Sequence, residues 1–247
     1  MLDAAQIEVV GEVLRYIAVA LAMGFGAIGS AVGEGHTAGM MLGGAARQPS
    51  EYGGLFRTML IGQAMAETAG VFALFIAIIL IWVSDPRTLV AAVANVSGGF
   101  AVGFSGIATG IGMGYVSSRA CEGMARQPEV SDRMMLSMLL AQAMVTSAFM
   151  FAFLVTVLLI FGGFRDTGSF NDIVHCAKYM GAGLAMGFGA CGPAIGVGIA
   201  GGEACRGIAA HQENSGLLTR MMFVGMAVAQ STAIYSLVIS LILLYAV

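Results

Sequence analysis

The sequence predicts an all-α integral membrane protein with six transmembrane helices, arranged as three tandem helical hairpins. Three observations lead to this fold class: the composition, six long apolar segments and a threefold internal repeat. Of the 247 residues, 58% are hydrophobic and only 10% are charged, and the mean hydropathy is +0.89. Soluble domains carry about a quarter charged residues. The composition therefore excludes a soluble enzyme, a secreted disulfide scaffold and a disordered chain.

Six apolar segments give the helices in chain order. A helix needs about 20 residues to cross about 30 Å of hydrocarbon, and backbone groups in lipid must be hydrogen-bonded within the protein. Every segment exceeds this length: 16–46, 58–84, 88–118, 134–164, 179–202 and 221–247. Taken in pairs, they predict hairpins at residues 1–84, 85–163 and 164–247.

The chain repeats itself at two fixed offsets. Leu21–Ala27 recurs unchanged at Leu184–Ala190, and the Ala-Arg-Gln-Pro sequence of Ala46–Pro49 recurs at Ala125–Pro128. Each repeat is a glycine-rich helix, a polar turn and a bulkier helix. Small residues let helix backbones approach closely in lipid. We therefore expect the glycine-rich helices to form a tightly packed inner ring and the bulky helices a lipid-facing outer layer. Generic packing in a helical bundle is the alternative.

The distribution of Lys and Arg predicts the orientation. Cytoplasmic loops of membrane proteins carry an excess of these residues, which places the three polar turns in the cytoplasm and both termini outside. The turn side carries Arg47, Arg57, Arg119, Arg126, Arg133, Arg206 and Arg220, and the opposite side carries Arg15, Arg87, Arg165 and Lys178. The net charge of −3 argues against nucleic acid as a partner.

Glu34 and Glu67 are the only formally charged residues within the six apolar segments. A carboxylate at mid-membrane is costly and marks a candidate functional site. Glu34 lies 15 residues before Pro49 and Glu67 lies 18 after it. At about 1.5 Å per residue, both fall roughly 20–25 Å below the turn, on adjacent helices. We expect one shared site; two separate carboxyls, each kept neutral by burial, are the alternative.

The other two repeats have lost these carboxyls. Glu67 aligns with Thr146 and Gln230, and Glu34 aligns with Met113 and Val197. Three hairpins therefore keep one ionisable site. A carboxylate with hydroxyl groups nearby can hold a proton or a small dehydrated cation, because oxygen ligands suit hard ions.

The glycine-rich first helix, the Ala-Arg-Gln-Pro turn and the Gly-Gln-Ala-Met-Ala-Glu-Thr sequence at 62–68 resemble the c subunit of F-type rotary ATP synthases. That protein is the proteolipid of the rotor ring. All three repeats share the resemblance, so it covers nearly the whole chain. The segment from Gln230 to Tyr245 is similar to sodium-translocating members, whose carboxylate normally stands at the position of Gln230.

The resemblance implies a homo-oligomeric ring in a bacterial inner membrane, with glycine-rich helices inside and bulky helices outside. It implies no catalytic site and no cofactor, only a transported Na⁺ or H⁺. The a subunit of the stator would supply an arginine, and the gamma and epsilon subunits of the central stalk would bind the turns Arg47-Gln48-Pro49 and Arg126-Gln127-Pro128. The third turn, Ala210-His211-Gln212, departs from this pattern.

The resemblance also implies the ion ligands. Glu34 and Glu67, with Gln63 and Thr68 beside them, match the first part of the family's site. The neighbouring hairpin would add a hydroxyl, a backbone carbonyl and a tyrosine, which match Ser231, Val228 and Tyr235 in repeat three. For Na⁺ we expect Glu67, Glu34 and Ser231 as ligands, with repeat three of the next protomer facing Glu67. Repeat two offers Ser147 but has Phe151 in place of the tyrosine.

The expected mechanism alternates between two states of this site. Facing lipid, the site must be neutral and hence occupied; facing the stator, it releases its ion. Two close carboxyls do not readily ionise together, so Glu34 is expected to keep a proton while Glu67 binds Na⁺. One site per three hairpins moves fewer ions per turn, which favours ATP-driven pumping. The alternatives are a proton-coupled rotor, a V-type or archaeal-type proteolipid, and a secondary transporter.

Overall fold

The computed structural model describes residues 4–84, 88–162 and 171–245. It contains six long helices, each long and apolar enough to cross a membrane. They are α1 (Ala4–Arg47), α2 (Tyr52–Trp82), α3 (Leu89–Arg126), α4 (Ser131–Phe161), α5 (Asn171–Ala210) and α6 (Ser215–Tyr245). The expected all-α fold with six spans is confirmed. The expected hairpin boundaries adjoin residues 85–87 and 163–170, which lie outside the described residues, as do Arg87 and Arg165.

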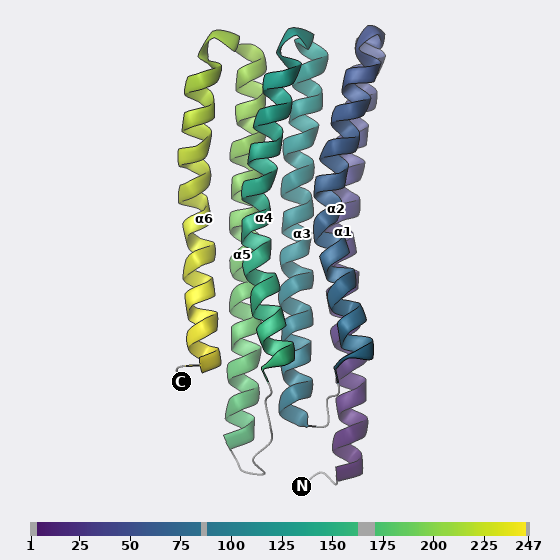
Figure 1. The fold of residues 1–247 in the computed structure, drawn as a ribbon, viewed down its shortest axis with the longest axis vertical. Coiled ribbons are helices and arrows are strands. Elements are labelled where there is room, and N and C mark those ends of the chain that lie inside the picture. The colour runs from purple at the N-terminus through teal and green to yellow at the C-terminus, as the bar shows by residue number, and fades with distance from the viewer. Residues whose placement is uncertain (1–3, 85–87, 163–170, 246–247) are drawn as a thin grey trace.

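Consecutive helices pair into three hairpins whose polar turns all lie at one end of the molecule (Figure 1). Each turn contains one short 3-10 helix: η1 (Pro49–Glu51), η2 (Pro128–Val130) and η3 (Gln212–Asn214). Proline suits the first position of such a turn because its φ is fixed and no N–H is needed there. The third turn has no proline, yet His211 (φ −138°, ψ 78°) repeats the backbone conformation of Gln48 (φ −134°, ψ 75°). The divergent sequence therefore preserves the turn.

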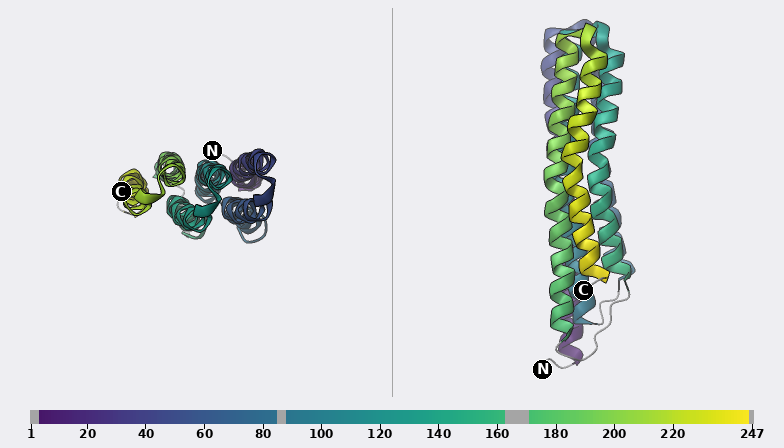
Figure 2. Two further views of the ribbon diagram at one scale, coloured as in Figure 1. Left: turned by 90° about the horizontal axis from the view of Figure 1, so that it is seen from above. Right: turned by 90° about the vertical axis from the view of Figure 1, so that its left-hand side faces the viewer.

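The glycine-rich helices α1, α3 and α5 lie side by side, with α3 in the middle (Figure 2). A methyl group added at Gly33 would collide with the carbonyl of Gly110, and one added at Gly110 would collide with the main chain of Gly29. Backbones this close require residues without side chains. The close packing expected of the glycine-rich helices is confirmed, and within one chain these helices form a row.

The bulkier helices α2, α4 and α6 cover one side of this row and expose apolar side chains. On α2 the exposed fraction is 37% for Ile81 and 75% for Trp82, and on α6 it is 48% for Val238. In water such surfaces would be unfavourable, whereas lipid tails accept them. The helices α1 and α5 are longer than the expected segments 16–46 and 179–202. The expected segments stop at the charged residues that flank them, because a charge is unfavourable in lipid. The helices continue past these residues because Arg and Glu are good helix formers.

Candidate ion-binding site

Glu34 and Glu67 line one groove between α1 and α2. The groove has a volume of about 230 Å³. Glu34 is half-buried and Glu67 is exposed on the surface of the chain. The remaining lining residues are small or apolar: Met23, Ala27, Ser30, Ala31, Gly70, Val71 and Leu74. The helices thus bring the two carboxyls predicted from sequence into one site.

Hydrogen bonds between α1 and α2 fix the register of this groove. The side-chain amide of Gln63 donates to the main-chain carbonyl of Glu34 at 3.1 Å. The buried hydroxyl of Ser30 donates to the carbonyl of Ala66 at 3.1 Å and accepts from the N–H of Gly70 at 3.2 Å. Sequence reasoning missed Ser30, although its place one helical turn before Glu34 was a usable signal.

Thr68 does not line the groove. Its hydroxyl donates to the carbonyl of Met65 at 2.7 Å, within its own helix. Successive side chains on an α-helix project about 100° apart, so the side chain of Thr68 projects about 100° away from that of Glu67. One turn later on the same face, Phe72 packs against the second hairpin, with ring centroids 5.0 Å from Phe153. Thr68 therefore lies toward the second hairpin.

The groove opens on the side of the first hairpin that faces away from the second. All of its lining residues belong to α1 and α2. The opposite face of α1 packs against α3 through Gly29 and Gly33, and α2 contacts α4 through Phe72. The candidate site therefore lies at one edge of the chain.

The residues predicted from repeat three lie at the other edge. Ser231 donates its hydroxyl to the carbonyl of Val228 at 2.8 Å on α6, and α6 occupies the far end of the arc from α1 and α2 (Figure 2). The exposed fraction is 70% for Val228 and 64% for Tyr235. Within one chain these residues do not meet Glu67.

The equivalent positions in the other repeats are occupied by neutral residues. The hydroxyl of Thr146 donates to the carbonyl of Gln142 at 2.9 Å. Gln230 is 7% exposed, and neither its amide nitrogen nor its amide oxygen has a hydrogen-bond partner among the described residues. No carboxylate stands at either position.

The predicted stalk-contact residues all lie at the turn end of the molecule. Arg47 and Pro49 are exposed at the first turn, and Arg126 is exposed at the second. Gln127 accepts a hydrogen bond at 2.8 Å from Gln212 in the third turn, so the second and third turns are joined. The remaining members of the set are Gln48 and Pro128, which are half-buried.

Comparison with known proteins identifies the repeats. The family model for the C subunit of ATP synthase matches residues 17–80, 96–159 and 180–243, one match within each hairpin. The chain belongs to the ATP synthase c-subunit family. The matched ranges begin at positions related by the same offsets as the internal repeat. The secondary-transporter alternative has no support from this comparison.

Individual members of this family match one hairpin's length of the chain. The ATP synthase c subunit of Petrotoga mobilis is 48% identical over 73 residues, which cover 30% of this chain and 76% of that protein. The one from Alkaliphilus oremlandii is 48% identical over 76 residues, covering 31% and 85%. The chloroplastic one from Ostreococcus tauri is 41% identical over 76 residues, covering 31% and 93%.

Membership of the c-subunit family defines the general role. The chain is an integral membrane component of the ion-translocating Fo sector of ATP synthase, without a catalytic site of its own. This family forms the oligomeric ring that works against the a subunit of the stator. This member joins three such hairpins in one chain.

Proposed function

We propose that the three hairpins share one ion site per chain, built by Glu34 and Glu67 and completed by the next chain in the ring. The neighbouring chain would contribute the hydroxyl of Ser231, the carbonyl of Val228 and the side chain of Tyr235. One observation carries the proposal: the carboxyl groove opens at one edge of the chain, and the three complementary residues lie at the other edge. In a closed ring these two edges would meet.

The internal junction between the first two hairpins offers a pattern for how such edges fit. Phe72 of α2 packs against two aromatic rings of α4, with centroid distances of 6.1 Å to Phe149 and 5.0 Å to Phe153. At a junction between chains, Tyr235 of repeat three takes the position of Phe72. Gly70 and Leu74 in the first repeat of the next chain take the positions of Phe149 and Phe153. The same packing between chains would set Tyr235 of one chain over the groove of the next. Repeat three is therefore a suitable source of the missing ligands.

The same correspondence disfavours Ser147 as a ligand. Ser147 occupies in α4 the position that Thr68 occupies in α2, and Thr68 lies toward the following hairpin. By analogy, Ser147 would lie toward the third hairpin, away from Glu67 of its own chain. Its hydroxyl donates to the carbonyl of Met144 at 2.6 Å.

The proposed mechanism follows from the cost of charge in lipid. An unpaired carboxylate at this depth is unfavourable, so the site travels through lipid only when occupied. Facing the a subunit, Glu67 releases its ion and pairs with the stator arginine. Glu34 keeps its proton while Glu67 binds Na⁺, because two close carboxyls do not readily ionise together.

We propose Na⁺ as the transported ion, with H⁺ as the alternative. Carboxylate, hydroxyl and carbonyl oxygens are the ligands that hard cations prefer. The carboxylate of Glu67, the carbonyl oxygen of the protonated Glu34 carboxyl and the hydroxyl of Ser231 would supply one of each. The sequence from Gln230 to Tyr245, similar to sodium-translocating members, supports the same choice.

One ion per three hairpins would reduce the charge that crosses the membrane in each turn of the ring. Each elementary charge moved against 100 mV requires about 2.3 kcal/mol. Fewer ions per ATP therefore allow pumping against a steeper gradient, and we propose that the ring is suited to ATP-driven pumping. An ion-to-ATP ratio equal to that of rings with one site on every hairpin would contradict this.

We further propose that the polar turns lie in the cytoplasm of a bacterial cell and that both termini lie outside. The hairpins divide at residues 84/85 and 163/164. At the cytoplasmic end, Arg47-Gln48-Pro49 and Arg126-Gln127-Pro128 contact the gamma and epsilon subunits. The bias of arginine toward the turns and the bacterial relatives support this arrangement.

Carbodiimide labelling of the purified ring, read by mass spectrometry with and without Na⁺, tests the site. These reagents modify protonated carboxyls in apolar surroundings. We expect labelling at Glu67, and suppression of that labelling by Na⁺. Labelling that Na⁺ leaves unchanged would make this a proton rotor. Labelling at neither Glu34 nor Glu67 would overturn the proposed site.

A further inference from the structure

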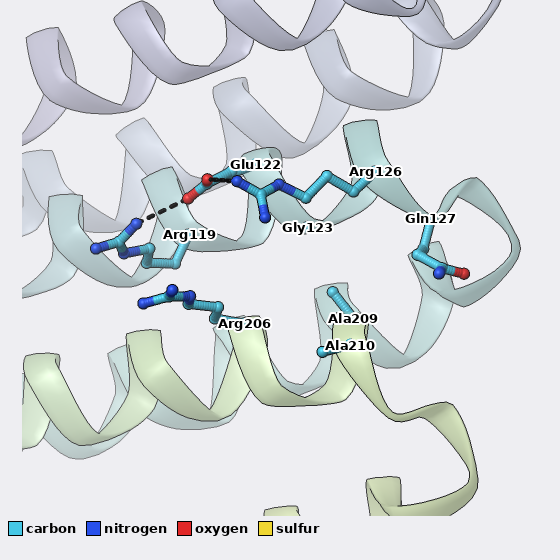
Figure 3. A pocket seen from close by; sticks show the side chains of 8 residues that line it. All are labelled: Arg119, Glu122, Gly123, Arg126, Gln127, Arg206, Ala209 and Ala210. Carbon is cyan, nitrogen blue, oxygen red and sulfur yellow. Dashed lines mark hydrogen bonds and ion pairs between the residues drawn. The ribbon is translucent and has the colours of Figure 1, made fainter.

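A second cavity lies between the ends of α3 and α5, next to the polar turns (Figure 3). It has a volume of about 270 Å³. Three of its lining side chains are arginines, namely Arg119 and Arg126 from α3 and Arg206 from α5. We call this cavity the arginine pocket. The proposed ion mechanism does not use it.

The arginine pocket keeps an excess of positive charge. Glu122 pairs with Arg119 at 2.8 Å and with Arg126 at 2.5 Å, as Figure 3 shows. Arg206 pairs with Glu203 at 3.4 Å, and its side chain is 59% exposed. Glu122 is the single carboxylate among the described residues that line the pocket. Counting Glu203, which also lies 3.6 Å from Arg119, three guanidinium groups face two carboxylates and one positive charge remains in excess. The buried Nε of Arg119 has no partner within the part of the chain that the structure describes.

The pocket is a product of divergence between the repeats. The positions of Arg119 and Glu122 are occupied in the first repeat by Met40 and Gly43. Ala210 stands where the other two repeats have Arg47 and Arg126. The short alanine side chain lines the pocket and leaves space there. This divergence places the pocket at the junction of the second and third hairpins.

The surface that continues from the pocket along the helices is apolar. One and two turns before Glu203 on α5 lie Ile199 and Ile195, whose exposed fractions are 50% and 40%. On the same face, Phe188 is 57% exposed and packs against Phe104 of α3 with ring centroids 4.7 Å apart. A charged pocket above an apolar strip matches the shape of a phospholipid, with a polar head and acyl chains.

We propose that the arginine pocket binds the phosphate group of an anionic phospholipid, with Arg206 and Arg119 as its donors. Guanidinium groups present paired N–H donors that match phosphate oxygens. Basic pockets between membrane helices on the cytoplasmic side suit anionic headgroups. The acyl chains would lie along Ile199, Ile195 and Phe188.

Native mass spectrometry of the purified ring, titrated with phosphatidylglycerol or with zwitterionic phosphatidylcholine, tests the proposal. We expect about one tightly held phosphatidylglycerol per chain and no comparable retention of phosphatidylcholine. Arg206→Gln should weaken phosphatidylglycerol binding about fivefold, since one arginine near a membrane surface contributes about 1 kcal/mol. Arg57→Gln removes the same charge from the exposed surface of α2 at the same end and should leave this binding unchanged.

Glu122→Gln provides a test that misfolding cannot imitate. The change removes the carboxylate that competes for Arg119 and Arg126, so phosphatidylglycerol should bind severalfold more tightly. Equal retention of both lipids, or equal losses in Arg206→Gln and Arg57→Gln, would overturn the proposal. Full displacement of phosphatidylglycerol by millimolar inorganic phosphate would assign the pocket to a free anion and overturn the lipid assignment.

Discussion

The side-chain amide of Gln63 donates to the main-chain carbonyl of Glu34 across 3.1 Å. This bond ties α1 to α2 through the backbone and leaves the carboxyl of Glu34 available. Within the described ranges 4–84, 88–162 and 171–245, neither Glu34 nor Glu67 accepts a side-chain hydrogen bond at its carboxyl. The helices are thus held together beside the groove by groups other than the two carboxyls.

Replacing Gln63 should therefore affect stability more than chemistry. Gln63→Leu removes one part-buried hydrogen bond and should lower the free energy of unfolding by about 1 kcal/mol, with Glu67 still reactive toward carbodiimide. Gln142→Leu should be more damaging, because Gln142 is fully buried and donates to the carbonyls of Gly62 and Met113, each at 3.2 Å. Thermal unfolding in detergent, followed by circular dichroism, compares the two. Equal effects would contradict this ranking.

The two carboxyls should respond differently to the same change. Glu67→Gln should abolish both carbodiimide labelling of α2 and ATP-driven ion transport, because the group that binds and releases the ion is gone. Glu34→Gln should retain Na⁺ protection of Glu67, since a neutral amide resembles the protonated acid that Glu34 is proposed to be. Labelling and transport in reconstituted vesicles measure both. Loss of Na⁺ protection in Glu34→Gln would mean that Glu34 binds the ion as a carboxylate.

Two equivalent serines distinguish the possible interfaces. Ser231→Ala should raise the Na⁺ concentration for half-protection of Glu67 by about ten- to a hundredfold, because a hydrogen-bonding or ligating group beside a charge contributes about 1.5–3 kcal/mol. Ser147→Ala, the same change one repeat earlier, should leave that concentration unaltered. Labelling titrated with Na⁺ gives both values. The reverse pattern would place the second hairpin beside Glu67 and reject repeat three.

The contact between α1 and α3 should tolerate no added methyl group. Gly110→Ala would bring its Cβ into the main chain of Gly29 and Ser30. Overpacking of this kind costs about 1–3 kcal/mol, and the displaced α1 should disturb the groove as well. Gly24→Ala is the matched control, because nothing among the described residues lies within 4 Å of the added carbon in the isolated chain. Thermal unfolding of the detergent-solubilised chain should separate the two variants; equal midpoints would refute the close contact.

The helices and the carboxyl pair could be predicted from sequence because both depend on simple physical rules. Apolar length fixes the six spans, and the count of residues from Pro49 sets Glu34 and Glu67 at matching depth. Both residues line one groove. Thr68 was predicted to lie beside these carboxyls in the site, but it does not line the groove, because a residue adjacent in sequence projects in a different direction around the helix.

The arginine pocket could not be predicted from the separate chain segments that form it. Arg119 and Arg206 lie 87 positions apart in the sequence. In the sequence their positive charges indicated only which side of the membrane the turns occupy, and not that the two residues share a pocket. Repeat alignment gives a register, but it does not reveal that α3 and α5 lie side by side with these residues on one face. The buried contact of Thr37 with Ser117, 2.6 Å between hydroxyl oxygens, was missed for the same reason.

The pairing of Arg119 with Glu203, at 3.6 Å, has an implication for symmetry. These two residues occupy the same position in successive repeats. In a ring of identical single hairpins, a residue at this position would stand beside its own copy, and every arginine would meet another arginine. A ring of identical single hairpins has a rotation axis whose order equals the number of hairpins. When three different hairpins are joined in one chain, the order of that axis falls to one third of the number of hairpins. Each position can then acquire a different residue in each repeat, so that opposite charges can be neighbours.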